Sequence, residues 1–190
     1  MRAIFLDRDG VICKNRSDHV KNWEEFQFLP EVKSALADLS QLELPIVVVT
    51  NQAIINRGLV TADIVNEIHR RMTAEVAANG ARVDRVFYCP HRPDEKCKCR
   101  KPEPGMLLQA ASEMGIDLAG SYMVGDATTD LIAGDRVGCQ TFLVLTGRGK
   151  SQLWLAFRSM SNRFAITRNL NEAATQIIKA ERQVALNVRL

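Results

Sequence analysis

The sequence predicts an α/β protein with a Rossmann-like parallel sheet flanked by helices, and three observations lead to this fold class. Short apolar runs rich in β-forming residues recur along the chain, each followed by a segment of helix length. One run, Ile46-Val47-Val48-Val49, is apolar at every position, as a strand covered on both faces requires. The 190 residues suffice for one buried core and contain no linker or repeat, so a single domain over residues 1–190 is expected.

Each element follows from its own local pattern. The apolar runs predict five strands, at residues 3–6, 45–49, 85–88, 122–124 and 141–145. Apolar residues at helical spacing predict three helices, at residues 31–42, 62–78 and 105–114. The chain from Ser151 onward looks less regular, and only a strand at residues 164–166 and a helix at residues 171–179 are expected there.

The bulk composition excludes several classes of function. An apolar fraction of 46% with 25% charged residues is typical of a globular chain and not of a disordered or collagen-like one. The apolar run at residues 3–6 is too short for a signal peptide or a membrane span, so a cytoplasmic protein without a membrane partner is expected. A net charge of +3 does not indicate nucleic acid, and we expect a monomer that binds none.

Polar residues follow three predicted strands at the ends where open α/β sheets bind ligands, namely Asp7, Thr50 and Asp126. Asp7 and Asp9 are two residues apart, so they can face one side with Cα atoms about 6 to 7 Å apart. One carboxylate can then attack phosphorus while the other protonates the leaving oxygen and later activates water. Gly10 leaves room for a phosphate. The alternative for this segment is an acidic turn at a strand end.

A carboxylate that attacks a phosphate needs a cation to offset the repulsion between them, and hard oxygen donors suit Mg²⁺. Asp130 is either an outer-shell ligand or an acidic residue in the first turn of a helix. A hydroxyl from Thr50 and the charge of Lys101 can hold the phosphate oxygens. The candidate magnesium ligands are Asp7, Asp9, Asp126 and Asp130.

A second metal site is predicted in the loop at residues 89–99. Three thiolates and one imidazole suit tetrahedral Zn²⁺ with no open position, so this zinc would be structural. The alternative is a reduced, metal-free cysteine cluster. Arg100 and Lys101 follow the last ligand directly, so the metal would fix a loop that aims two cations at a substrate. The four candidate zinc ligands are Cys89, His91, Cys97 and Cys99.

These segments, in this order, resemble the haloacid dehalogenase superfamily of aspartate-nucleophile phosphatases. The resemblance implies that Asp7 is phosphorylated, that Asp9 acts as acid and base, and that Thr50 and Lys101 hold the phosphoryl group. It also implies that Asp126 binds Mg²⁺ and that no large cap domain is present. The motifs Leu6-Asp-Arg-Asp-Gly-Val, Thr50-Asn-Gln, Tyr88-Cys-Pro-His, Cys97-Lys-Cys-Arg-Lys-Pro-Glu-Pro-Gly-Met and Tyr122-Met-Val-Gly-Asp look like those of the D-glycero-D-manno-heptose 1,7-bisphosphate 7-phosphatases.

The closer resemblance implies a small phosphorylated metabolite as substrate, with Arg100 recognising its second polar end. Ala127 departs from the pattern, since a lysine or polar residue is common there. The loop after Gly10 aligns only loosely with the family's substrate loop, and a solvated loop is the alternative. The further candidate substrate contacts are Arg16, Ser17, Asp18, His19, Asn51 and Gln52.

Two other functions remain open at this point. The bacterial histidinol-phosphate phosphatases share the zinc loop, and the short spacing from His91 to Cys97 is also found in their loops. The chain could instead be a non-catalytic zinc-ribbon module that binds nucleic acid through the basic residues of the loop. Asp94 and Glu95 interrupt that basic run, the loop lacks aromatic residues for stacking, and the acidic motifs would be left without a purpose.

Overall fold

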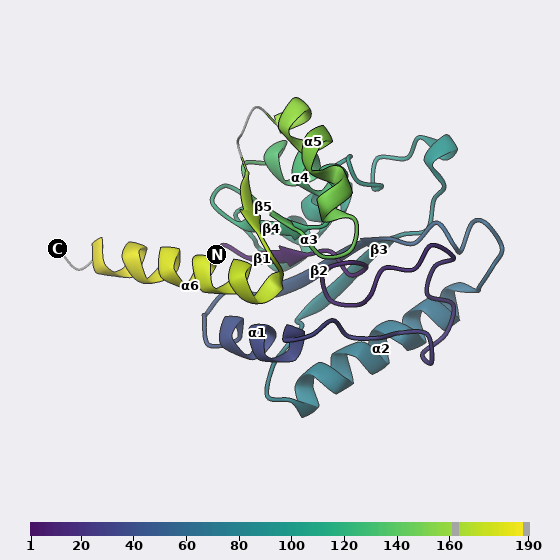
Figure 1. Ribbon diagram of the computed structural model, residues 1–190, viewed down its shortest axis with the longest axis horizontal. Coiled ribbons are helices and arrows are strands. Elements are labelled where there is room, and N and C mark those ends of the chain that lie inside the picture. The colour runs from purple at the N-terminus through teal and green to yellow at the C-terminus, as the bar shows by residue number, and fades with distance from the viewer. Residues whose placement is uncertain (161–163, 188–190) are drawn as a thin grey trace.

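The protein, described here by a computed structural model for residues 1–160 and 164–187, is built on one six-stranded parallel sheet (Figure 1). The strand order is β3-β2-β1-β4-β5-β6, so the order reverses between β1 and its neighbour β4. Every pairing in this sheet is parallel. The strands are β1 (Ile4–Leu6), β2 (Ile46–Asn51), β3 (Arg85–Cys89), β4 (Tyr122–Gly125), β5 (Gln140–Val144) and β6 (Ala165–Thr167).

Helices cover both faces of the sheet. Figure 1 shows α1, α2 and α6 below the strands and α3, α4 and α5 above them. Among the described residues, no helix combines the length and the apolar character that crossing a bilayer requires. The helices are α1 (Val32–Leu39), α2 (Ala62–Ala78), α3 (Gly105–Met114), α4 (Thr128–Asp135), α5 (Gly149–Met160) and α6 (Leu170–Asn187), with a 3₁₀ turn η1 (Pro93–Glu95).

The strands separate two apolar layers because successive side chains point to opposite faces. In β1, Ile4 and Leu6 pack into the cluster that includes α1, α2 and α6 residues, whereas Phe5 packs into the cluster beneath α3. In β2, Val48 and Val49 divide between the same two clusters. The unbroken apolar run of β2 is therefore explained by burial on both sides, and the predicted fold class is confirmed.

The structure corrects the expectation of an irregular chain after Ser151. Helix α5 extends from Gly149 to Met160, and α6 is twice as long as the helix expected at residues 171–179. The outward side of α5 carries exposed apolar residues such as Trp154 and Phe157, so its sequence has no clean polar face. Helix α4 was not predicted as a separate element. It is short, and Gly134 lets it pack closely on Met123 of β4.

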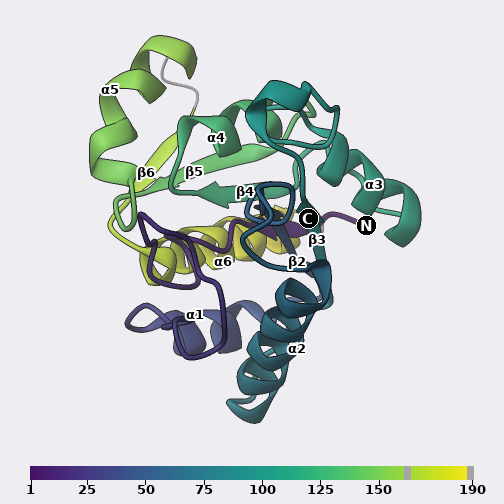
Figure 2. The same cartoon turned by 90° about the vertical axis from the view of Figure 1, so that its right-hand side faces the viewer.

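All six strands point their carboxyl ends toward the same edge of the sheet, where the long loops gather. Figure 2 looks toward this side of the molecule, with the loop after β1 and the loop after β3 in the foreground. Ligands of open α/β sheets bind where the strand order reverses, in the crevice between the two diverging loops. Strands β1 and β4 form this switch point, and they lead directly into Asp7 and Asp126.

Candidate active site

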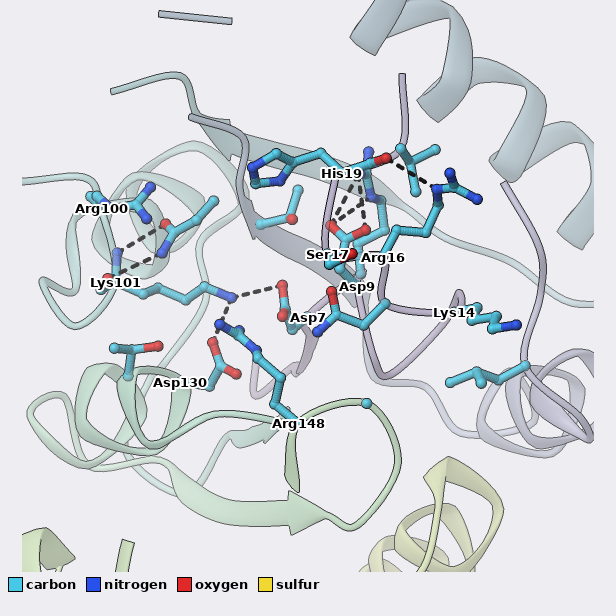
Figure 3. Close-up of a pocket in the computed structure, with 18 of the residues that line it drawn as sticks. Asp7, Asp9, Lys14, Arg16, Ser17, His19, Arg100, Lys101, Asp130 and Arg148 are labelled. Atoms are coloured by element: carbon cyan, nitrogen blue, oxygen red, sulfur yellow. Dashed lines mark hydrogen bonds and ion pairs between the residues drawn. The ribbon is translucent and has the colours of Figure 1, made fainter. Parts of the chain in front are cut away.

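Lys101 lies at the centre of the site and joins two carboxylates that are far apart in the sequence. Its Nζ is 2.9 Å from Asp7 Oδ1 and 2.7 Å from Asp130 Oδ1. Figure 3 marks both contacts with dashed lines. The same amine donates a hydrogen bond of 2.6 Å to the carbonyl of Val49. Burial alone would lower the pKa of Lys101, but Asp130 and Asp7 outweigh it and raise that pKa. The amine is therefore a fixed positive charge.

Three buried carboxylates, those of Asp7, Asp126 and Asp130, offer ligand oxygens within 4.8 Å of one another. Burial, which Lys101 only partly offsets, raises the pKa of Asp7 from 3.8 to about 7. Burial and the neighbouring Asp130 also raise the pKa of Asp126. The three carboxylates share two cationic partners, Lys101 and Arg148, and their donors are the hard oxygens that Mg²⁺ prefers. The residues present therefore fit a magnesium ion.

Two glycines make room for these carboxylates. A Cβ at Gly10 would lie 2.1 Å from Asp126 Oδ2, and one at Gly125 would lie 2.3 Å from Asp130 Oδ2. Gly10 also has a φ of +88°, which favours glycine. The glycines next to Asp9 and Asp126 are thus required by the crowding of the site itself.

Asp130 lies in the first turn of α4, as one of the two alternatives predicted, and it also forms an ion pair. Its Oδ2 accepts a hydrogen bond of 3.0 Å from the backbone N–H of Ala127 and so caps α4, while its Oδ1 contacts Lys101. The departure at Ala127 leaves this cap intact because only the backbone of that residue takes part. A carboxylate at a helix N-terminus is also favoured by the helix dipole.

Asp9 lies outside the three-carboxylate group because its own neighbours hold it. Arg8 Nη2 donates to Asp9 Oδ1 at 3.2 Å and to Oδ2 at 3.0 Å, and Gln52 Nε2 donates to Oδ2 at 2.9 Å. Burial opposes ionisation of Asp9, but Arg8 and Gln52 outweigh it and lower its pKa. Of the four predicted magnesium ligands, the structure thus brings together the side chains of Asp7, Asp126 and Asp130 but not that of Asp9.

His69 of α2 lies behind this ion pair, with its Nε2 3.0 Å from Arg8 Nη1. Burial and the Arg8 charge lower the pKa of His69 from 6.5 to about 3, so the imidazole is neutral at physiological pH. Because the unfolded chain binds a proton here between pH 6.5 and pH 3 and the folded protein does not, His69 costs stability as the pH falls through that range.

We expect the substitution His69→Gln to remove this acid sensitivity. The free energy of unfolding of the variant minus that of wild type should rise by about 2 kcal/mol when the pH is lowered from 7 to 5. Urea unfolding at the two pH values measures the change. An equal difference between the two proteins at both pH values would show that His69 is not held neutral.

The polar residues that follow β2 are used within the protein. Thr50 Oγ1 accepts a hydrogen bond of 2.8 Å from Gln52 Nε2, and Thr50 also lines the cavity. The side-chain amide of Asn51 bonds to the backbone of Lys101 in both directions, at 3.1 Å each. The contacts of Asn51 and Gln52 in this structure therefore position Lys101 and Asp9, and their direct contact with a substrate stays a prediction.

The predicted zinc ligands converge on one point. The distances of Cys89, Cys97, Cys99 and His91 Nδ1 from one another range from 3.2 to 3.6 Å where they are in contact. Ligands placed tetrahedrally about 2.0 to 2.3 Å from a zinc ion would be about 3.3 to 3.8 Å apart. The sulfur separations are far longer than the roughly 2.05 Å of a disulfide. The residues present therefore fit a zinc ion.

A cavity of about 900 Å³ opens over Asp7 and Asp9 at the carboxyl edge of the sheet. Figure 3 shows Arg16, Ser17 and His19, from the loop after Gly10, across the cavity from Arg100. Asp18 does not line the cavity and instead pairs with Arg16 at 3.1 Å. Arg100 lines the cavity and donates to the carbonyl of His91 at 3.1 Å, so the loop that contains the cysteine cluster supports it directly.

The sequence reading missed three basic residues around this cavity. Arg148 follows β5 and contacts Asp126 through its backbone N–H at 2.7 Å and through Nη2 at 3.3 Å. Lys14 also lines the cavity, and Arg57 contacts His19 with an Nη1 to Nε2 distance of 2.8 Å. Arg148 follows a predicted strand at its carboxyl end, so the signal that identified Asp7 and Asp126 could have found it.

Comparisons with known proteins agree with this geometry. Residues 98–173 match the family described as "HAD-hyrolase-like", the haloacid dehalogenase-like hydrolases. The chain is 43% identical over 146 residues to the D-glycero-beta-D-manno-heptose-1,7-bisphosphate 7-phosphatase of Pseudomonas aeruginosa, which covers 77% of this chain and 82% of that protein. The enzyme of the same name from Bordetella bronchiseptica is 42% identical over 80% of this chain and 86% of its own length.

Solved structures point the same way. The crystal structure of the B. bronchiseptica D,D-heptose 1,7-bisphosphate phosphatase, complexed with magnesium and phosphate, matches with a TM-score of 0.89 and 38% identity over 95% of this chain and 99% of that one. The Burkholderia thailandensis enzyme matches with a TM-score of 0.72 and 30% identity over 94% and 99% of the two chains. Fold and site together define a hydrolase of the haloacid dehalogenase type. Within that class, the chain belongs to the D-glycero-D-manno-heptose 1,7-bisphosphate 7-phosphatase family.

Proposed function

We propose that the protein is a Mg²⁺-dependent phosphatase that removes the 7-phosphate of D-glycero-D-manno-heptose 1,7-bisphosphate through an aspartyl-phosphate intermediate. The observation that carries the proposal is the buried group formed by Lys101 with Asp7 and Asp130 at the switch point of the sheet. Relatives bearing this enzyme's name match more than three quarters of the chain. Their names specify the β anomer, and we propose the same anomer here.

In the first half of the reaction, a carboxylate oxygen of Asp7 attacks the phosphorus of the 7-phosphate. Burial opposes ionisation of Asp9, but Arg8 and Gln52 outweigh it and keep the resting carboxylate ionised, so Asp9 takes up a proton from solvent in the substrate complex. The bond from phosphorus to the sugar oxygen then breaks, and Asp9 gives that proton to the oxygen. Lys101 lies 2.9 Å from Asp7 and can contact the phosphate oxygens as they gain charge, together with the hydroxyl of Thr50. These interactions are strongest in the transition state, which is the condition for acceleration.

In the second half, water attacks the phosphorus of phosphorylated Asp7. Asp9 takes a proton from that water, the bond between phosphorus and Asp7 breaks, and inorganic phosphate leaves. Asp7, Asp126 and Asp130 are the side chains that would hold Mg²⁺ or orient its ligands, and the bound ion would offset the repulsion between a carboxylate and the phosphate. Arg148 and Lys101 reduce the remaining negative charge of the carboxylates.

The cavity suits a substrate that is charged at both ends. Arg100, supported by the proposed zinc loop, is positioned to contact the end of the substrate that does not react. Apart from Arg8, whose guanidinium is paired with Asp9, the basic side chains that line the cavity are Lys14, Arg16, Arg100, Lys101 and Arg148. This charge distribution supports a doubly phosphorylated sugar over a substrate with one phosphate, because a second phosphate would have cationic partners of its own.

A side-by-side measurement of kcat/KM tests the substrate. We expect the heptose bisphosphate to be turned over at least about 100-fold more efficiently than histidinol phosphate, since loss of one well-paired phosphate costs about 3 kcal/mol. If kcat/KM is equal for the two substrates or higher for histidinol phosphate, the protein would be assigned to the histidinol-phosphate phosphatases. Tight binding to polynucleotides without phosphatase activity would instead support the zinc-ribbon alternative. The comparisons favour neither alternative.

A further inference from the structure

Two buried residues beside the catalytic aspartates have no part in the chemistry proposed above. Arg8 is only 1% exposed although it lies between Asp7 and Asp9 in the sequence, and His69 is 5% exposed. A buried guanidinium has to be paired, because an unpaired buried charge is strongly unfavourable. The partners of Arg8 therefore show what its burial achieves.

The donor nitrogens of Arg8 contact Asp9 and two other side chains, those of Gln52 and His69. Nε and Nη2 reach Asp9 at 3.0 to 3.2 Å, whereas Nη2 also donates to Gln52 Oε1 at 3.0 Å. Gln52 in turn donates to Asp9 Oδ2 at 2.9 Å. Guanidinium and amide thus hold the same carboxylate from two directions. The planar guanidinium fork also fixes the orientation of the carboxylate.

His69 supports the remaining end of the guanidinium. Its Nε2 is 3.0 Å from Arg8 Nη1, and since a guanidinium only donates, Nε2 must be the acceptor and Nδ1 must carry the proton. The ring of Tyr88 from β3 packs against His69 at a centroid distance of 5.6 Å. The charged groups that act on His69 are Arg8 and Asp9. The imidazole is thus a fixed acceptor that stops Arg8 from rotating.

We propose that His69 is a positioning residue, which acts through Arg8 to hold the Asp9 carboxyl group where it can transfer a proton to the leaving oxygen. This inference rests on the proposed function, because that function gives Asp9 its acid and base role. His69 does not touch the reacting atoms. Its influence passes through two contacts, from Nε2 to Arg8 and from Arg8 to Asp9.

The test compares two leaving groups in the full-length protein with Mg²⁺ present. The alkoxide that leaves a sugar phosphate needs a proton, whereas 4-nitrophenolate leaves without one. Because kcat/KM reports the reaction through formation of the phosphoenzyme, displacement of Asp9 should lower it selectively for the alkyl phosphate. We expect His69→Leu to lower kcat/KM for the heptose bisphosphate by about 10 to 100-fold and for 4-nitrophenyl phosphate by less than about 3-fold.

Conservative variants separate positioning from a general structural role. His69→Gln can place its Oε1 near the position of Nε2, so it should recover the heptose bisphosphate activity to within about 3-fold of wild type. His69→Asn has the same amide but a shorter reach, and it should behave like His69→Leu. It also replaces the leucine variant if that protein does not fold. Val76→Ala, in the buried face of α2 and outside the site, serves as the stability control and should leave the ratio of the two activities unchanged.

The outcomes are distinct for the two proposals. A wild-type protein without activity on either phosphate monoester would overturn the proposed function, and the inference would fail with it. If wild type acts on histidinol phosphate and not on the heptose bisphosphate, histidinol phosphate becomes the assigned substrate. The ratio of its kcat/KM to that of 4-nitrophenyl phosphate would then be compared among the variants. An active wild type with equal losses for both leaving groups, or with no loss in the leucine and asparagine variants, would overturn the role of His69.

Discussion

Replacing Asp7 by asparagine should lower kcat by at least about 10⁴-fold while the protein stays folded, because an amide cannot form the phosphoenzyme. The fold should tolerate the change. Burial and the neighbouring carboxylates already raise the pKa of Asp7 to about 7, so a neutral group there relieves repulsion, and Lys101 keeps Asp130 as its partner. Steady-state kinetics measure the loss, and mass spectrometry after rapid quenching should find phosphorylated protein only in the wild type.

A matched control is available on α1, outside the cavity. Asp38 is exposed on α1, so Asp38→Asn makes the same chemical change away from the cavity and should leave kcat within about 2-fold of wild type. Thermal unfolding of both variants shows whether the fold is intact. Near-normal turnover by Asp7→Asn would show that Asp7 is not the nucleophile. It would also contradict the aspartyl-phosphate mechanism.

Loss of the proposed zinc ion should affect substrate binding more than the chemical step. Substitution of Cys99 by serine, or removal of the metal by a chelator, leaves residues 89–99 without the ligand contacts that fix them. Arg100 depends on the carbonyl of His91 within that loop, whereas Lys101 is held independently by Asn51 and by its buried ion pairs. We therefore expect KM to rise about 10-fold and kcat to change by less than about 3-fold.

Metal analysis has to accompany these kinetics, with Mg²⁺ restored after the chelator is removed. Cys139→Ala is the matched control, since Cys139 is buried outside the cluster, and its zinc content and KM should equal those of wild type. Unchanged kinetics in protein shown to be free of zinc would show that substrate binding does not depend on a zinc ion in this loop. A fall in kcat at constant KM would instead place the main effect of the loop on Lys101.

The regular elements with strong periodicity were predictable from local sequence. The observed bounds of α2 and α3 agree with the expected helices at residues 62–78 and 105–114, and each of the six expected strands, including the one at residues 164–166, lies within two residues of an observed one. Helices α4 and α5 were harder to predict because tertiary contacts dominate them. Gly134 packs α4 closely on β4, and Trp154 leaves an apolar residue on the outer side of α5.

The composition of the site was predictable because the chemistry needs particular residue types at strand ends. Asp7, Thr50 and Asp126 were identified in this way and Lys101 by its place after the cysteine cluster, and all four are buried around one edge of the sheet. The supporting contacts were not predictable. Nothing in the local sequence indicates that Asn51 holds the backbone of Lys101, or that Asp130 both caps α4 and contacts Lys101.

The sequence by itself determined the fold class, the two sets of metal-ligand types and the phosphate chemistry, since these depend on periodicity and on which side chains follow a strand. Only the tertiary structure decided how the carboxylates are divided. It places Asp7 with Asp126 and Asp130, and it turns Asp9 toward Arg8 and Gln52. The physical reason is that hydrogen bonding and charge pairing in a buried site depend on distances between segments far apart in the chain. His69 is 61 residues from Arg8, and only folding brings its ring nitrogen to 3.0 Å from the guanidinium.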